Sequence, residues 1–290
     1  MAAETAASPT FAELQRPLPA RSARAWRFAA ARAASHAGAL LSDGLRIGYA
    51  HGFDSGPFMA HVYADEATGR TAVGRALDRR LLDMRTCVAF RDIRGLAETA
   101  VLDAADAVAE AERPPVIADL AAGSAPYLLH TLAARPRVRA IAGDIDPGAL
   151  AVAEAAARKL GVDGRLTTLC ADAFDRAALA ALPARPDVVV ELGLYGIYHD
   201  DALIQRHFHD LAALVSPNQI VFNVQTRNPE IEHIARVWVN QAGGRCVWRL
   251  RPVEQLLEWA RDAGYEPATV EADRFDIYRV VRLVREDEAA

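Results

Sequence analysis

The chain contains the stretch Val116-Ile-Ala-Asp119-Leu-Ala-Ala-Gly123-Ser-Ala-Pro-Tyr127, in which a short apolar run ends in an acidic residue. The pattern predicts a buried strand that turns sharply into a helix, because Gly123 allows a close backbone approach and Pro126 suits a first helical turn. Ser124 is expected to cap this helix. Such a turn brings backbone N–H groups to the carboxyl edge of a sheet, where open α/β folds bind ligands.

Further strands are predicted after this turn by β-branched runs that alternate with helical stretches. Two such runs at the C-terminal end are separated by a short turn and predict an antiparallel hairpin. The expected architecture is therefore an α/β fold with a doubly wound sheet of five parallel strands followed by a hairpin. The expected strands span 116–120, 138–143, 165–169, 187–192, 219–224, 265–271 and 275–284.

The N-terminal part has a different character. Residues 1–20 are rich in Ala, Pro and Ser and are expected to form a mobile tail. Residues 21–113 show helical apolar spacing, interrupted by a glycine-rich stretch at 43–56 that is expected to be a loop. This region is interpreted as a lid in which Phe58 and Tyr63 contact substrate, with packing in the core as the alternative. The boundary falls at the tandem prolines, so the sheet domain is expected over 114–290, with an insertion at about 229–250.

The next expected strand ends in Asp144-Ile145-Asp146-Pro147, about 20 residues after Gly123. An ionised carboxylate at this place can accept hydrogen bonds from both hydroxyls of a ribose, and it repels a 2′-phosphate. Asp146 precedes a proline and is interpreted as a helix cap. The ribose ligand is therefore expected to be Asp144.

A third polar group follows the third expected strand, in the sequence Cys170-Ala-Asp172-Ala-Phe174. A carboxylate at Asp172 can accept from an adenine amino group while Phe174 lies against the ring. The alternative is that Asp172 caps the following helix. Three polar groups at the ends of three successive strands point to an adenine nucleoside more strongly than any one of them.

The composition excludes several classes of protein. The 290 residues carry 33 Lys and Arg against 38 Asp and Glu, a net charge of −5, and 52% are hydrophobic. These values disfavour a polybasic nucleic-acid binder and a disordered acidic chain. The sequence shows neither an apolar run of membrane-spanning length nor a secretory leader, so a cytoplasmic protein is expected. The three distant cysteines indicate reduced thiols, and no metal site is expected.

Together these motifs resemble the class I S-adenosylmethionine-dependent methyltransferases. The resemblance covers roughly residues 114–284 and implies a Rossmann-like fold with S-adenosyl-L-methionine as the cofactor. Two other segments, Gly193-Leu-Tyr195 and the N-terminal 41–56, are similar to those of a bacterial subgroup often fused to α/β-hydrolases. The chain departs from the class pattern in the first turn, where Gly123 is kept but alanines replace the outer two glycines. The expected cofactor contacts are Asp119, Gly123, Ser124, Tyr127, Asp144, Ile145, Asp172, Ala173, Phe174 and Glu191.

Candidates for the chemistry follow the fourth and fifth expected strands. Tyr195 and His199 could orient or deprotonate an acceptor, and Tyr127 could face the sulfonium. The alternative for His199 is a loop histidine bonded to a neighbouring aspartate. The expected substrate contacts here are Asn223, Gln225 and Arg227; the alternative for Arg227 is an exposed turn.

Three functions remain open at this point. The first is methyl transfer to a small molecule in biosynthetic metabolism, by in-line attack on the sulfonium methyl. The second is a cyclisation in which the amine of S-adenosylmethionine attacks its own γ-carbon, giving azetidine-2-carboxylate and methylthioadenosine, as in synthases that resemble this subgroup. The third is a binding module without turnover. The expected partner is a small-molecule acceptor, or the cofactor itself as sole substrate, with neither a nucleic acid nor a membrane span.

Overall fold

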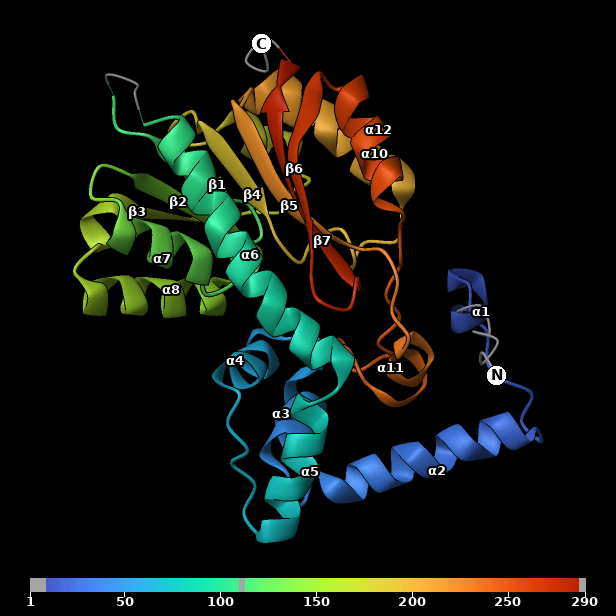
Figure 1. The fold of residues 1–290 in the computed structure, drawn as a ribbon. Coiled ribbons are helices and arrows are strands. Elements are labelled where there is room, and N and C mark those ends of the chain that lie inside the picture. The colour runs from blue at the N-terminus through green and yellow to red at the C-terminus, as the bar shows by residue number, and fades with distance from the viewer. Residues whose placement is uncertain (1–8, 110–112, 287–290) are drawn as a thin grey trace. The chain divides into compact units, whose positions relative to one another are not determined.

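The computed structural model describes residues 9–109 and 113–286 (Figure 1). The chain divides into two compact units. We call them the helical unit, made of Met1–Asp92 and Arg227–Leu250, and the sheet unit, made of Ile93–Thr226 and Arg251–Ala290. The insertion expected at about 229–250 therefore belongs to the helical unit.

The sheet unit contains seven strands in the order β3-β2-β1-β4-β5-β7-β6. Strands β1 to β5 run parallel, and β7 lies antiparallel to both β5 and β6. This confirms the fold class predicted from the sequence. The bounds are β1 Val116–Asp119, β2 Arg139–Asp144, β3 Leu166–Cys170, β4 Val188–Glu191, β5 Gln219–Gln225, β6 Tyr265–Ala272 and β7 Tyr278–Arg285.

Helices cover both faces of this sheet. Helices α7 and α8 lie on one face, and α10 and α12 lie on the other (Figure 1). The strand order reverses between β1 and β4, which makes the carboxyl ends of these strands the switch point where open α/β sheets bind ligands. The bounds are α6 Arg85–Ala107, α7 Pro126–Ala134, α8 Pro147–Leu160, η1 Asp163–Arg165, α9 Arg176–Ala180, α10 Asp201–Asp210, η2 Leu211–Val215 and α12 Val253–Asp262.

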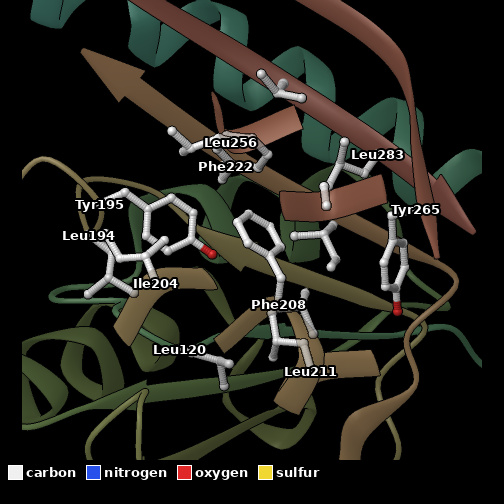
Figure 2. Close-up of a cluster of buried hydrophobic side chains, with 14 of the residues drawn as sticks. Leu120, Leu194, Tyr195, Ile204, Phe208, Leu211, Phe222, Leu256, Tyr265 and Leu283 are labelled. Atoms are coloured by element: carbon white, nitrogen blue, oxygen red, sulfur yellow. The ribbon is translucent and has the colours of Figure 1, made fainter. Parts of the chain in front are cut away.

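The core of the sheet unit lies beneath α10 and α12. Figure 2 shows the rings of Tyr195, Phe208 and Phe222 together in this core, and all three side chains are fully buried. Their ring centroids lie 5.5 to 5.7 Å apart, in tilted or edge-on arrangements that aromatic pairs favour. This packing fixes α10 against β5.

The helical unit is built around an aromatic cluster. Phe53 stacks on Trp238 with a centroid distance of 4.7 Å, and Phe58 meets both rings edge-on. All three side chains are buried, so the structure shows the alternative given for Phe58, packing in a core. The bounds are α1 Phe11–Gln15, α2 Ala23–Gly38, α3 Asp43–His51, α4 Gly56–Ala64, α5 Ala72–Leu82 and α11 Ile231–Val237.

Several local predictions in this unit are wrong. Residues 1–8 of the expected mobile tail lie outside the described residues, but α1 falls within that tail, and its Leu14 is buried. The expected loop at 43–56 consists mostly of helix α3, which begins after Ser42 caps its first turn. Within the insertion, the described residues contain one isolated β-bridge, which joins Val239 to Arg245.

Candidate functional site

The turn after β1 has an open space above its glycine. Gly123 has a φ of +53°, and a Cβ placed there would meet no atom within 4 Å. Ala125 also adopts the left-handed conformation, with a φ of +55°, and stands at the N-cap of α7. Ser124 is exposed and does not cap this helix, so that prediction is wrong. The first turn of α7 is thus left without a side-chain cap.

Asp144 ends β2 directly beside this turn. Its Oδ2 accepts a hydrogen bond of 2.8 Å from the backbone N–H of Gly123, and its Oδ1 accepts one of 2.8 Å from that of Asp146. A carboxylate offers about four acceptor positions, so about two remain for a ligand. The half-buried Asp144 is therefore fixed in orientation and still able to bind two hydroxyls.

The neighbouring Asp146 has a separate task. Its Oδ1 accepts a hydrogen bond of 2.8 Å from the backbone N–H of Gly148, and it is the N-cap of α8. The prediction that Asp146 caps a helix is confirmed. Ile145, between the two aspartates, is 65% exposed and is available to a ligand as an apolar surface.

The turn after β3 lies next to a small hollow with a cavity volume of about 10 Å³. Asp172 is exposed and accepts a hydrogen bond of 2.9 Å from the backbone N–H of Phe174. Asp175, and not Asp172, caps the following helix α9, so the alternative role for Asp172 is excluded. The hollow is lined by Leu120, Gly143, Leu169, Ala171, Asp172, Ala173, Ala178, Leu179 and Leu182.

Asp119, the last residue of β1, is buried behind the turn. Its Oδ1 accepts a bond of 3.2 Å from the backbone N–H of Ala121. Burial, with a further contribution from the carboxyls of Asp144 and Glu191, raises the pKa of Asp119 to about 8. Asp119 is therefore largely protonated at neutral pH, and its role is to support the turn.

Glu191, the last residue of β4, is fully buried and bonded inside the protein. The hydroxyl of Tyr195 donates to its Oε2, and Nε2 of His207 lies 2.5 Å from its Oε1. Burial, and then the adjacent Glu191 carboxyl, raise the pKa of Tyr195 well above its ordinary value. Because Tyr195 is buried and its hydroxyl is engaged, the structure contradicts direct contact of Tyr195 with an acceptor. Glu191 likewise faces the core and not the turn.

The loop after β4 is held by two buried side chains. The backbone N–H of Gly193 donates to Oδ1 of Asn223 over 2.7 Å. The guanidinium of Arg251 bonds to Asp201 over 2.8 Å and to the carbonyl oxygens of Tyr195 and Tyr198. Asn223 therefore positions this loop through its side chain.

The remaining predicted residues of the sheet unit lie in different surroundings. Tyr127 is buried in the first turn of α7, and Ala173 is buried beside the hollow. His199 is exposed on the loop after β4, just before Asp200 caps α10. Gln225 is buried at the end of β5, and its Nε2 has no hydrogen-bond partner among the described residues.

Three predicted substrate contacts belong to the helical unit. Phe58 is fully buried in the aromatic cluster, which contradicts its role as a substrate contact. Tyr63 is half-buried on α4. Arg227 is exposed between β5 and α11, as its alternative reading stated.

Two buried residues that contact the ends of β4 and β5, His207 and Arg251, are absent from the predicted site. The signal for His207 was its place among Ile204, Phe208 and Leu211 on the apolar face of α10, where a histidine requires a buried partner. The signal for Arg251 was weaker, because a single arginine before a helix is usually exposed.

Over residues 9–109 and 113–286, no group of three His, Cys, Asp or Glu side chains could hold a metal ion. Within the same part of the chain, none of the helices has the length and apolar character required to cross a bilayer.

The sheet order, the glycine turn after β1 and the carboxylate at the end of β2 are the features of a class I S-adenosylmethionine-dependent methyltransferase. The comparison with known families agrees. Residues 2–285 match the family described as "Putative methyltransferase", and the chain belongs to this family. The prediction of a methyltransferase family is confirmed.

Relatives and solved structures extend this result. The uncharacterized protein YnbC of Escherichia coli is 30% identical over 252 residues, which are 85% of this chain but 43% of YnbC, so the chain spans less than half the length of this relative. A "possible exported protein" from Bordetella parapertussis has a TM-score of 0.64 at 18% identity, covering 92% of this chain and 98% of that one. The S-adenosylmethionine-dependent methyltransferase SibL has a TM-score of 0.52 at 18% identity, covering 92% and 72%. These two similarities show the fold.

Proposed function

We propose that this chain binds S-adenosylmethionine at the carboxyl edge of its sheet and transfers the sulfonium methyl group to a small molecule. The observation that carries the proposal is the position of Asp144, whose two oxygens are oriented by the backbone of the glycine turn and of Asp146. A preoriented carboxylate binds hydroxyls at a low entropic cost.

The residues present fit the cofactor. Asp144 would hold the ribose hydroxyls, and the exposed carboxyl of Asp172 would accept a hydrogen bond from the amino group of the adenine base. The open space above Gly123 would admit the methionine part next to the uncapped end of α7. When bound, the sulfonium supplies an activated methyl group. The contribution of the protein is then to orient the cofactor and the acceptor and to exclude water.

The choice of a small acceptor rests on charge. The chain is acidic overall, and a nucleic-acid substrate would favour a net positive protein. Exposed His199, on the loop anchored by Asn223 and Arg251, is the candidate to orient or deprotonate this acceptor. The cytoplasmic location, the role in biosynthesis and the subgroup fused to hydrolases remain predictions.

One observation favours a second candidate reaction, the cyclisation to azetidine-2-carboxylate. The turn above the methionine position carries Ala125 in a left-handed conformation followed by Pro126, so its backbone is more restricted than a turn of three glycines. A turn that binds the methionine part in a different conformation could direct the amino group of S-adenosylmethionine to the γ-carbon of the same molecule. In that reaction the N–Cγ bond forms, the Cγ–S bond breaks and the amine loses a proton.

A single incubation distinguishes these reactions. Purified protein is incubated with S-adenosylmethionine, with and without a metabolite extract, and the nucleosides are identified by mass spectrometry. The proposal predicts S-adenosylhomocysteine, formed only when the extract is added. Methylthioadenosine together with azetidine-2-carboxylate, formed without extract, would establish the cyclisation instead. If the cofactor binds but is unchanged under both conditions, the chain acts as a binding module without turnover.

A further inference from the structure

Phe174 is held in place by two aromatic rings of the sheet unit. Its ring centroid lies 4.6 Å from that of Tyr198 and 4.7 Å from that of His207, with tilted planes in both pairs. The backbone N–H of the same residue donates to Asp172. The turn that borders the hollow is therefore fixed at one end by a hydrogen bond and at the other by ring packing.

The ring of His207 is held in turn by the carboxyl of Glu191. Its Nε2 lies 2.5 Å from Oε1 of Glu191, and the side chains of both residues are at most 1% exposed. Glu191 ends β4, in the centre of the sheet, whereas Phe174 follows β3 at its edge. His207 thus connects the rigid centre of the sheet to the turn at its edge.

Stability alone does not explain a histidine at this position. The second ring nitrogen, Nδ1, is buried and has no hydrogen-bond partner among the described residues. A buried polar atom without a partner lowers stability, and an apolar pair in place of His207 and Glu191 would avoid this loss. The His207–Glu191 pair lowers the stability of the folded chain relative to an apolar pair. This cost is consistent with a role of the pair in the site.

We propose that His207 is a positioning residue for S-adenosylmethionine: bonded to Glu191 and packed under Phe174, it fixes the 172–174 turn against which the adenine base binds. The inference rests on the proposed function. It assigns to Glu191 an indirect role, because this carboxyl orients His207 and does not touch the cofactor.

Ligand binding to the full chain tests this inference. The dissociation constants of S-adenosylhomocysteine and of methylthioadenosine are measured by titration calorimetry for the wild type, His207→Ala and Tyr195→Phe. The His207→Ala change is expected to weaken the binding of both ligands by the same factor, about tenfold, because both contain the same 5′-thioadenosine part with its adenine base. Tyr195→Phe is the matched control, since it removes the other bond to Glu191 without touching Phe174, and it should stay within about twofold of the wild type.

A second variant and a double-mutant cycle keep the test decisive. If His207→Ala does not fold, His207→Gln retains an amide donor for Glu191 but removes the ring, and an about fivefold weakening is expected. In a Phe174→Ala background, loss of the His207 ring should have little further effect, because its action passes through Phe174. A merely structural role would not produce this coupling.

Three results would overturn the inference while leaving the proposed function intact: unchanged affinity in the His207 variants, an equal loss in Tyr195→Phe, or fully additive effects with Phe174→Ala. A wild-type protein that binds neither ligand would overturn the proposed function, and the inference with it.

Discussion

Acidic residues end three adjacent strands, and their surroundings give them different tasks. Asp119 on β1 is buried with one backbone donor, Asp144 on β2 is half-buried with two, and Glu191 on β4 is bonded to Tyr195 and His207. Only Asp144 combines a fixed orientation with access to a ligand. The residue type alone therefore does not distinguish the proposed ribose ligand, Asp144, from its two neighbours, whereas burial does.

The raised pKa of Asp119 predicts a pH-dependent stability. Since the folded value of about 8 lies above the ordinary value of 3.8, the folded state binds more protons between these pH values than the unfolded state does. The free energy of unfolding should thus fall as the pH rises from about 4 to about 8, by at most about 1.4 kcal/mol per pH unit from this group. Urea unfolding across this range, compared with Asp119→Asn, measures the contribution. An Asn variant that keeps the full wild-type slope would contradict the assignment.

Among the elements, the strands were predictable and the N-terminal helices only in part. The strand ends fell within a few residues of expectation because continuous β-branched runs such as Val188–Glu191 match buried parallel strands. The glycines of 43–56 misled the prediction because they serve close packing and not chain reversal. A Cβ on Gly48 would lie 2.4 Å from the ring of Phe53, and one on Gly44 would lie 2.7 Å from Nε2 of His61. Contacts between residues distant in sequence, such as that of Trp238 with Phe53, leave no periodic signal.

Helix α8 provides a prediction at the level of the element. Asp146→Ala removes the N-cap hydrogen bond to Gly148 and should lower the free energy of unfolding by about 1 kcal/mol. The same variant should bind S-adenosylmethionine with unchanged affinity, because its side chain serves the helix. Chemical denaturation and titration calorimetry on one preparation check both statements. A loss of affinity without a loss of stability would exchange the roles of Asp144 and Asp146.

At the scale of the whole molecule, the chain combines a sheet unit with a helical unit that includes residues 227–250, and the family match extends over both. The chain leaves the sheet unit after β5 and returns at Arg251, whose backbone N–H donates to the carbonyl oxygen of Gln225 over 3.0 Å. This hydrogen bond joins the point where the chain leaves the sheet unit to the point where it returns. The sequence predicted an insertion at about 229–250. It did not predict that this insertion folds with the N-terminal helices, because their contacts join residues that are far apart in the sequence.

Cofactor binding should stabilise the folded chain by mass action. At a concentration of S-adenosylhomocysteine about 100 times its dissociation constant, the gain is about 2.7 kcal/mol, which appears as a rise in Tm. The rise should be much smaller for Asp144→Ala at the same ligand concentration and should persist for Asp146→Ala. Differential scanning fluorimetry measures all three proteins together. Equal rises in all three would show that Asp144 does not contribute to ligand binding.

The most direct measurement is the dissociation constant of S-adenosylmethionine for the wild type and for Asp144→Ala, by titration calorimetry. We predict saturable binding to the wild type, weakened in the variant by about 1–3 kcal/mol through the loss of charge-assisted hydrogen bonds to the ribose. An unchanged constant in the variant, or no binding by the wild type, would contradict a cofactor site at this edge of the sheet.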